Sequence, residues 1–382
     1  MIGIRNVNCF DGARIIEHAS VAVSGTSIAG VWEGGDALPA CDTVIDGEGR
    51  LLVPGYIDLH LHGCAGCDVM DGTAESLRTI AETLAQNGTT SFLPTTVTMP
   101  KQATAKAMAA VRAYGNPATG AEVLGVHLEG PFINVRHKGA QNERYILEPS
   151  VPAFLDFVDG DLSGIRRVTL APEIGEGIGL TRYLAQRGVC VSAGHTCASA
   201  EAFHASEKAG LKLCTHLYNG MEPMHHRTPG TVGAALASDE AYVEVIADLN
   251  HVAPDVLRLT AKAKDAGHCI LITDSLSATG LGDGEYSLGG QKVTVQNGTA
   301  RVESGSLAGS VIFLWQAVKN MAERVHVNLV SALRMATVNP ARVIGAENRK
   351  GAVRPGFDAD LNLLRDDLSV AFTMVRGRVV KA

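Results

Sequence analysis

The sequence predicts an α/β fold, a (β/α)8 TIM-like barrel joined to a small β-sandwich domain. Eight short apolar runs recur along the middle of the chain, roughly 20 to 45 residues apart, which is the repeat length of βα units. Helix-like segments separate the runs, for example residues 73–88 and 104–115. Eight such units close naturally into a barrel, although strand count alone leaves a doubly wound open sheet as the competing arrangement.

The two ends of the chain differ from this middle. Residues 1–50 alternate apolar and polar side chains between turn residues, as in "SVAVSGTSIAGVWEGGD", and the last thirty residues repeat this style. Alternation with period two is typical of half-buried antiparallel strands. We therefore expect residues 1–51 and 346–382 to build one small β-sandwich domain, and residues 52–345 to build the barrel.

Polar residues gather at the C-terminal tips of the predicted barrel strands. In chain order these strands are "GYIDLHLH", "TTSFLPTT", "VLGVHLEG", "RVTLAPE", "VCVSAGH", "KLCTH", "VEVIAD" and "CILITD". Because all strand tips of a barrel open onto one mouth, we expect six side chains to converge there. They are His60, His62, Glu129, His195, His216 and Asp274. A strand of period two points His60 and His62 to the same side, as a shared metal ion would require.

A purely structural role explains these six residues less well than a metal site does. A single histidine at a strand end is usually a polar residue near the surface. Four histidines and two carboxylates on separate tips have no comparable structural role, because burying them unpaired costs roughly several kcal/mol. The sequence therefore predicts a metal-binding centre in the mouth of the barrel.

Composition limits the partners of this protein. The chain has 382 residues, 46% of them apolar, which is enough for a large core. A net charge of −7 gives no bulk attraction to nucleic acid or to an anionic membrane, so an anionic substrate requires a local basic pocket. We find no apolar run of about 18 residues and no signal-peptide layout at the N-terminus, and we expect a cytoplasmic protein.

The eight cysteines are scattered, and we expect reduced thiols in the cytosol. Cys64 and Cys67 have the spacing of a redox motif. They follow the histidine pair in a glycine-rich loop, not at the start of a thioredoxin-like helix. Accidental metal capture or oxidation is the better expectation for them.

The motifs resemble the amidohydrolase superfamily and, within it, the family of N-acetylglucosamine-6-phosphate deacetylases. The matching segments run in the family's order over most of the chain. They include "PGYIDLHLHG", "LPTTVT", "GVHLEGPFINVRHKGAQN", "LAPE", "VSAGHT", "THLYNGM", "HHRTPG", "IADLNHV", "LITDS", "SLAGS" and "MATVNPARVIG". The combination of "HLEGPF" with "THLYNGM" is specific to this deacetylase group. The closing "RPGFDADLNLL" resembles the superfamily's return to its small β domain.

The resemblance implies a set of metal ligands. Glu129, His195 and His216 match the principal ligands, and one carboxylate with two imidazoles suits a catalytic zinc ion. Iron or another divalent ion fits nearly as well. Some relatives keep the His-x-His pair and bind a second metal. Since this chain retains His60 and His62, we expect one or two divalent ions, with Glu129 bridging them in the second case.

The resemblance also implies a catalytic role for Asp274. Metal binding lowers the pKa of water towards about 7, and a carboxylate beside that water takes its proton during attack on the acetyl carbon. The same group then delivers the proton to the departing amine. The alternative role for Asp274 is to cap a following turn, as Asp often does in such sequences.

Further residues match the family's substrate site. Arg227 supplies a cation for the sugar phosphate, because its fork makes bidentate contacts, and family members draw this arginine from the neighbouring subunit. The resemblance therefore implies a homodimer. The other predicted substrate-binding residues are Ala140, Gln141, Asn219, Gly220, His251, Leu307, Ala308 and Gly309.

Two departures from the family pattern stand out. Relatives usually read Asp-Gly-x-His where this chain has Asp248-Leu249-Asn250-His251, which is expected to alter that loop. Several relatives have a histidine in place of Gln141, and that histidine helps to polarise the acetyl carbonyl. A glutamine donates a hydrogen bond but carries no charge, and a second metal at His60 and His62 could take over the polarising role.

The resemblance implies hydrolysis of the acetamide of N-acetylglucosamine 6-phosphate to glucosamine 6-phosphate and acetate. The sequence does not distinguish this substrate from N-acetylgalactosamine 6-phosphate. More distant alternatives are an amidohydrolase acting on a cyclic amide and a metal-free scaffold. "HLEGPF" and Arg227 argue against the first, and retention of all six polar tips argues against the second.

Overall fold

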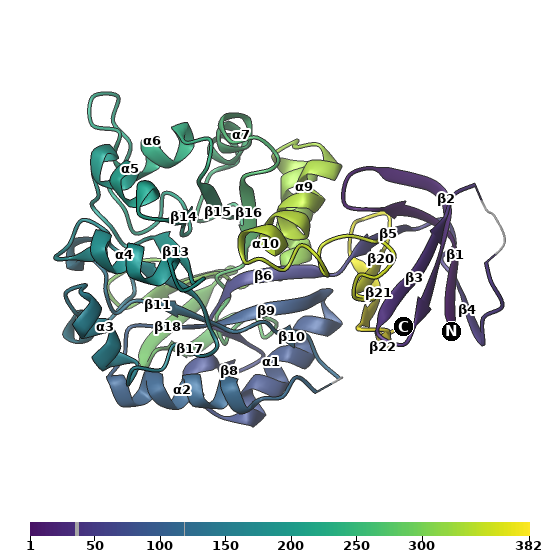
Figure 1. The fold of residues 1–382 in the computed structure, drawn as a ribbon, viewed down its shortest axis with the longest axis horizontal. Helices are drawn as coiled ribbons and strands as arrows, with labels where there is room; N and C mark the ends of the chain where they lie inside the picture. Colours follow the sequence, from purple (N-terminus) through teal and green to yellow (C-terminus); the bar gives the residue numbers. More distant parts are fainter. Residues whose placement is uncertain (35–37, 118) are drawn as a thin grey trace.

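The computed structural model describes residues 1–34, 38–117 and 119–382, and it consists of a barrel with a small β-sheet module beside it (Figure 1). Eight parallel strands form the barrel. They are β6 (Tyr56–Leu61), β9 (Thr89–Thr96), β11 (Val126–Glu129), β12 (Ile165–Leu170), β13 (Cys190–Ala193), β14 (Leu211–Cys214), β15 (Tyr242–Ile246) and β16 (Cys269–Ile272). Each strand overlaps one of the eight predicted runs, and β12, β14 and β15 begin one or two residues before their runs.

The barrel closes between its last strand and its first. The backbone N–H of Asp274 donates to the carbonyl of His60 at 2.9 Å, and Leu61 forms a parallel bridge with Ser275. This closure excludes the open sheet and confirms the predicted barrel. Strands β6 and β9 are buried along their whole length, as strands covered on both faces must be.

Helices cover the outside of the barrel (Figure 1). They are α1 (Ala74–Gln86), α2 (Lys101–Ala113), α3 (Val151–Phe157), α4 (Gly177–Ala185), α5 (Ala200–Lys208), α6 (Gly230–Ala237), α7 (Pro254–Ala263), α8 (Leu314–Lys319), α9 (Leu329–Ala336) and α10 (Val338–Val343). Short helical turns span Val69–Asp71, Val135–His137, Glu143–Tyr145 and Asn320–Arg324. Helix α1 illustrates why these segments form helices and pack against the barrel. The Thr73 side chain accepts from the N–H of Ser76, and Leu77, Ile80 and Leu84 form one buried stripe.

The two chain ends join in one eight-stranded sheet, as the sequence predicted. Its strands are β1 (Ile2–Phe10), β2 (Ile15–Ser24), β3 (Ser27–Trp32), β4 (Thr43–Asp46), β5 (Leu51–Pro54), β20 (Leu361–Leu364), β21 (Val370–Val375) and β22 (Arg378–Lys381). The sheet curls on itself, because the N–H of Ile28 donates to the carbonyl of Phe357. The curled sheet encloses a single apolar core that includes Ile4, Val21 and Leu361.

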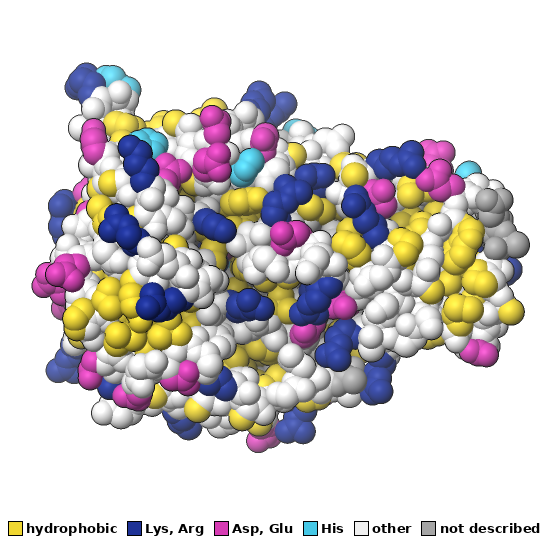
Figure 2. Space-filling model, in the orientation of Figure 1, with side chains coloured by type: hydrophobic (Ala, Val, Ile, Leu, Met, Phe, Trp, Pro, Cys, Tyr) yellow, Lys and Arg dark blue, Asp and Glu magenta, His cyan; other side chains and the backbone are white. Residues whose placement is uncertain are grey.

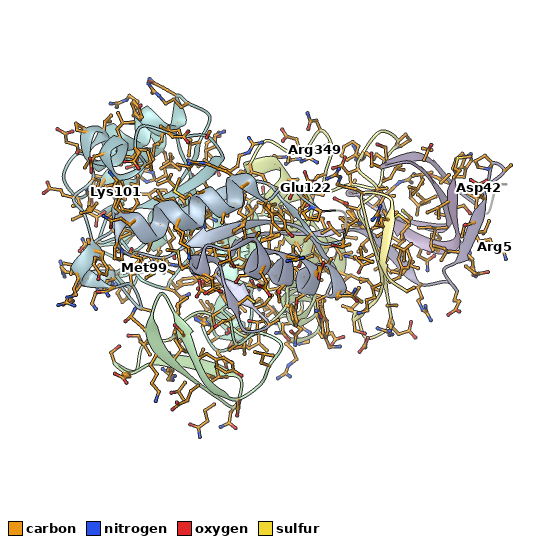
Figure 3. The ribbon with its side chains drawn as sticks, turned by 90° about the horizontal axis from the view of Figure 1, so that it is seen from below. Arg5, Asp42, Met99, Lys101, Glu122 and Arg349 are labelled. Carbon is orange, nitrogen blue, oxygen red and sulfur yellow. The ribbon has the colours of Figure 1, made fainter. Side chains whose placement is uncertain are left out.

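A second, smaller sheet near the barrel mouth was not predicted. Strands β17 (Gly284–Leu288), β18 (Gln291–Gln296) and β19 (Thr299–Val302) form an antiparallel meander that projects from the barrel (Figure 3). The signal was present in the sequence, since Gly-Gly and Asn-Gly pairs separate alternating runs there. Three short strands complete the structure: β7 (Gly63–Cys64), β8 (Cys67–Asp68) and β10 (Glu122–Val123).

A buried ion network joins the barrel to the small sheet module. The Lys350 ammonium lies 2.7 Å from Glu122 and 2.9 Å from Asp358, and Arg349 also pairs with Glu122 (Figure 3). Burial raises the pKa of Glu122, but Arg349 and Lys350 outweigh this and lower it to about 2. The domain limits at residues 51 and 346 stay a prediction.

Acidic and basic side chains are mixed over the surface, with apolar groups between them (Figure 2). Among the described residues, no helix has both the length and the apolar character needed to cross a membrane.

Candidate active site

The six side chains from the strand tips lie together in the barrel mouth. His60 lies in β6 and Glu129 in β11, His62 comes directly after β6, and the other three lie two residues after β13, β14 and β16. All six are buried or nearly so: His60, His62, Glu129, His195, His216 and Asp274. Five of them line a cavity of about 380 Å³, and His60 lies behind it. The arrangement follows from the fold, because the carboxyl ends of parallel barrel strands face the same side.

The six residues form two adjacent groups of possible metal ligands. Glu129, His195 and His216 form one group, and His60, His62 and Asp274 form the other. In the first group, Nε2 of His195 and Nε2 of His216 each lie 3.2 Å from Oε1 of Glu129. In the second, Nε2 of His62 lies 3.2 Å from Oδ1 of Asp274.

Glu129 lies between the two groups. Its Oε1 faces His195 and His216, and Nε2 of His60 is 3.4 Å from the same oxygen. Its Oε2 faces His62 at 3.4 Å. Oε1 therefore lies near both histidines of the first group and His60 of the second, and Oε2 lies near His62, so the carboxylate contacts both groups as a bridging carboxylate would.

The imidazoles are oriented as metal ligands usually are. Nδ1 of His195 lies 2.9 Å from the carbonyl oxygen of His137, and Nδ1 of His62 lies 3.1 Å from the carbonyl oxygen of Thr95. A carbonyl only accepts, so each Nδ1 carries the proton and each Nε2 presents a lone pair to the carboxylates. Both ring nitrogens of His60 are buried without a hydrogen-bond partner. Lone pairs aimed at carboxylates, together with orphaned buried nitrogens, fit a divalent cation between them.

The backbone is strained at three of these residues. His195, His216 and Asp274 have φ values of 48°, 30° and 49°, in the left-handed region that non-glycine residues rarely adopt. Each follows the last residue of a barrel strand by two positions. Such strain costs about 1–3 kcal/mol per residue and clusters at functional sites. Here it turns three side chains inward where the chain leaves the barrel wall.

Both carboxyl groups of the site are ionised. Burial raises the pKa of Asp274, but the adjacent imidazoles of His60 and His62, when they are protonated, outweigh this and lower it to about 2. Burial likewise raises the pKa of Glu129, and the surrounding histidines hold it well below its usual value. The site therefore presents two negative charges to a cation.

A buried ion pair supports the site from beneath. Arg167 on β12 and Glu244 on β15 are both fully buried, and Nη2 of Arg167 donates to Oε2 of Glu244 at 2.8 Å. Arg167 also donates to Oγ1 of Thr215 at 2.9 Å. Oε2 of Glu244 lies 3.7 Å from Nδ1 of His60. The carboxylate of Glu244 thus lies beside His60, the most deeply buried of the six candidate ligands.

Most of the predicted substrate-binding residues surround the same cavity. Those lining it are Ala140, Gln141, Asn219, Gly220, His251, Leu307 and Gly309. Ala308 is fully buried behind the wall. These positions agree with the expected substrate site, and the individual roles remain predictions.

Gln141 has a different set of contacts from the one expected for a group facing substrate. Its Nε2 donates to Oε2 of Glu129 at 2.8 Å, and its Oε1 accepts from the N–H of Thr98 at 2.6 Å. Both ends of the amide are therefore engaged. Gln141 holds the central carboxylate in place, which a neutral amide can do without adding charge.

The loop before His251 adopts a glycine-like conformation without glycine. Leu249 has a φ of 68°, so the leucine occupies the left-handed region. Asp248 stabilises the turn, since Oδ1 accepts from the N–H groups of Asn250 and His251, both at 2.9 Å. Oδ2 of Asp248 lies 2.7 Å from Nδ1 of His251. The main chain therefore keeps the conformation that a glycine would adopt here. The departure from the family pattern adds only the Leu249 side chain.

Arg227 lies outside the cavity of its own chain. It occupies an exposed segment between β14 and α6, which projects from the barrel at the upper left of Figure 1. Lys, Arg and His side chains gather at the tip of that projection (Figure 2). Nη1 of Arg227 lies 2.7 Å from Nε2 of His226. The side chain is exposed and lines no part of the cavity, and its role in a homodimer stays a prediction.

Several cavity residues were not predicted. Arg136, His137, Tyr218, Leu288 and Ser306 also line the cavity. Arg136 and His137 belong to the loop after β11, inside the matched segment "GVHLEGPFINVRHKGAQN", so their position next to Glu129 could have indicated them. Leu288 comes from the unpredicted β17–β19 sheet.

Comparisons with known proteins agree with this geometry. A model of the amidohydrolase family matches residues 51–380. The chain is 36% identical over 380 residues to an N-acetylglucosamine-6-phosphate deacetylase of Bacillus subtilis (strain 168), covering 98% of this chain and 96% of that protein. It is 38% identical over 341 residues to an N-acetylgalactosamine-6-phosphate deacetylase of Escherichia coli O157:H7, covering 88% and 89%.

A solved structure has the same fold. The crystal structure of N-acetylglucosamine-6-phosphate deacetylase from Pasteurella multocida matches with a TM-score of 0.93 and 31% identity, over 100% of both chains. The family model covers most of this chain, and the curated relatives exceed 30% identity over nearly its whole length. The chain belongs to the amidohydrolase family.

Proposed function

We propose that this chain is a metal-dependent hydrolase that removes the acetyl group from N-acetylglucosamine 6-phosphate, yielding glucosamine 6-phosphate and acetate. The observation that carries the proposal is the position of Asp274. Its ionised carboxylate borders the cavity, and its Oδ1 lies 3.2 Å from Nε2 of His62, one of the six candidate ligand side chains. The names of the relatives support this substrate class.

The residues of the chain divide the work as follows. Glu129, His195 and His216 would hold one divalent ion, and His60 and His62 would hold a second. Zn²⁺ suits this set of imidazole and carboxylate ligands best, and Fe²⁺ is the nearest alternative. When bound, such an ion supplies Lewis acidity, which polarises a carbonyl and lowers the pKa of water.

Asp274 moves the proton. Its carboxylate accepts a proton from the attacking water as the new bond to the acetyl carbon forms. The protonated Asp274 then donates to the amine nitrogen as the carbon–nitrogen bond breaks, and acetate leaves. Asp274 is suited to this because its main chain is fixed on both sides: its N–H donates to His60, and its carbonyl accepts from Ser310 at 2.8 Å.

The experiment that tests the proposal compares substrates at defined metal loading. We expect the highest kcat/KM for N-acetylglucosamine 6-phosphate, loss of turnover after chelation, and recovery when a divalent ion is restored. A higher kcat/KM for N-acetylgalactosamine 6-phosphate would assign the activity of the E. coli relative instead. Turnover that survives complete metal removal, or a preference for a cyclic amide, would contradict the proposal.

Arg227 is proposed to bind the sugar phosphate across a homodimer in the cytosol. Replacing Arg227 by Ala should raise KM for the phosphorylated substrate about 10- to 100-fold with little change in kcat, since a hydrogen bond to a charged group is worth about 1.5–3 kcal/mol. The matched control is Arg258→Ala on α7, another exposed arginine.

Steady-state kinetics on the phosphorylated and unphosphorylated sugars check the role of Arg227. An equal effect on the unphosphorylated sugar would rule out phosphate recognition by this side chain. Subunit exchange with an Asp274→Asn chain would test the dimer, because complementation requires a site shared between two chains.

A further inference from the structure

Three metal-binding side chains meet beside the cavity, apart from the six residues of the barrel mouth. An imidazole nitrogen of His137, the thiol sulfur of Cys197 and a carboxylate oxygen of Glu222 all lie within 4.8 Å of one another. Nε2 of His137 is 3.3 Å from Oε1 of Glu222. All three residues are partly buried, so the cluster is enclosed yet reachable from solvent. His137 also lines the cavity wall, which places the cluster at its rim.

The backbone holds the three residues in register. Thr196 and Met221 form a parallel bridge, so the next residue of each segment, Cys197 and Glu222, come side by side. The N–H of Asn134 donates to the carbonyl of His195 at 2.8 Å, and the N–H of His137 donates to the carbonyl of Asn134 at 3.0 Å. These bonds tie the loop that carries His137 to the strand end that leads to Cys197.

Glu173 binds two of the three segments from behind. One of its oxygens accepts from Nδ2 of Asn134 at 2.8 Å and from the N–H of Cys197 at 2.7 Å, and the other accepts from Oγ1 of Thr196. The segments that carry His137, Cys197 and Glu222 are thus held together by hydrogen bonds of the main chain and of Glu173. None of these bonds involves the three metal-ligating atoms. This arrangement is expected of a preorganised site.

We propose that His137, Cys197 and Glu222 bind a transition-metal ion of the Zn²⁺ class at the rim of the cavity, separately from the ions of the barrel mouth. Thiolate, imidazole and carboxylate are all ligands of Zn²⁺, and three protein ligands leave the fourth tetrahedral position to water. Binding breaks the S–H bond of Cys197 and releases its proton to solvent.

The distances suit this class of ion. Two ligands of a tetrahedral zinc ion lie about 3.3–3.7 Å apart. The His137–Glu222 separation of 3.3 Å already meets this value. All three ligand atoms lie within 4.8 Å of one another, so a shift of about 1 Å at most brings them to the spacing of a coordinated ion.

The charges near the cluster favour a cation. The carboxylate of Glu222 belongs to the cluster and that of Glu173 accepts from the N–H of Cys197 at 2.7 Å, so two negative charges border the site. Arg136 is the competing occupant, since its Nη2 lies 3.1 Å from Oε1 of Glu222. Its side chain is 70% exposed and can move into solvent at little cost.

A bound ion would affect the barrel mouth through His137. The carbonyl of this residue accepts the Nδ1 proton of His195, a candidate ligand of the first group. Fixing the His137 side chain therefore also fixes the main-chain group that orients His195.

Cobalt substitution of the holoenzyme tests the proposal. The six candidate ligands in the barrel mouth include no thiol, so thiolate-to-cobalt charge-transfer absorption reports only a cysteine site. We expect this absorption in the wild-type protein on Co²⁺ addition, and its loss in Cys197→Ser. Elemental analysis after Zn²⁺ loading should find one equivalent fewer in Cys197→Ser than in the wild type. Glu222→Gln should weaken Co²⁺ binding at this site at least about 10-fold.

The matched control is Cys67→Ser. Cys67 is also partly buried, and it pairs across the β7–β8 hairpin with Cys64. These two thiols are the alternative place where cobalt could be captured. Its replacement should leave the absorption and the metal content unchanged. Absorption that persists in Cys197→Ser, that vanishes in Cys67→Ser, or that never develops in the wild type would overturn the proposal. Deacetylase activity of Cys197→Ser, measured in parallel, separates this outcome from failure of the proposed function.

Discussion

Replacing Asp274 by Asn should lower kcat by about 10²–10⁴-fold, the usual contribution of a positioned general acid or base. The amide has nearly the shape of the carboxylate but cannot accept a proton from water or return one to the amine. The main-chain bonds of Asp274 to His60 and Ser310 do not involve the side chain, so the backbone should keep its position. The five remaining candidate ligands stay in place, and we expect the divalent metal content to remain.

Two measurements on the purified variant make this result specific. Metal content by elemental analysis should match that of the wild type, and thermal unfolding should show a folded protein. The matched control is Asp265→Asn, which replaces a carboxylate near the start of β16, at the opposite end of the same strand, and should keep full activity. Turnover close to wild type in Asp274→Asn would falsify the proton-transfer role. Loss of metal together with activity would instead assign Asp274 to metal binding.

The barrel could be predicted because its strands leave a strong local signal. The eight runs are short and apolar, helix-like segments separate many of them, and each run overlaps a strand. The β17–β19 sheet was missed because its strands are half-exposed and interrupt the βα repeat after β16. A repeat-based reading assigns such a segment to a loop unless its Gly-Gly and Asn-Gly turns are weighed separately.

The candidate site was predictable where topology alone decides position. The tips of parallel strands must meet, so the approach of Glu129 to His195 and His216 followed from strand order. Contacts that depend on loop conformation did not follow. The sequence could not indicate that Gln141 turns to Glu129, or that Leu249 adopts a left-handed φ. Nor could it bring Cys197 beside Glu222, because the bridge between Thr196 and Met221 joins two irregular segments.

Removing Arg167 should destabilise the protein more than any change at its surface. Arg167→Met leaves the Glu244 carboxylate fully buried without its partner, and breaking a buried ion pair in this way costs about 3–5 kcal/mol. The guanidinium also donates to Thr215 and to the carbonyl of Leu59, which would lose those bonds. The free energy of unfolding, obtained from urea denaturation, should fall by that amount.

Two further variants separate the ion pair from the volume of the side chain. Arg166→Met changes the adjacent, exposed arginine of β12 and should alter the free energy of unfolding by less than about 0.5 kcal/mol. The double change Arg167→Met with Glu244→Leu removes both charges, and it should recover most of the lost stability because apolar groups often replace a buried pair at no net cost.

Since Oε2 of Glu244 faces Nδ1 of His60 at 3.7 Å, the recovered protein should still bind metal less tightly at the His60 and His62 group. Equal stability of Arg167→Met and the wild type would show that the carboxylate of Glu244 is neutralised by other means. Wild-type metal affinity in the double variant would show that the Arg167–Glu244 pair does not affect metal binding by His60 and His62.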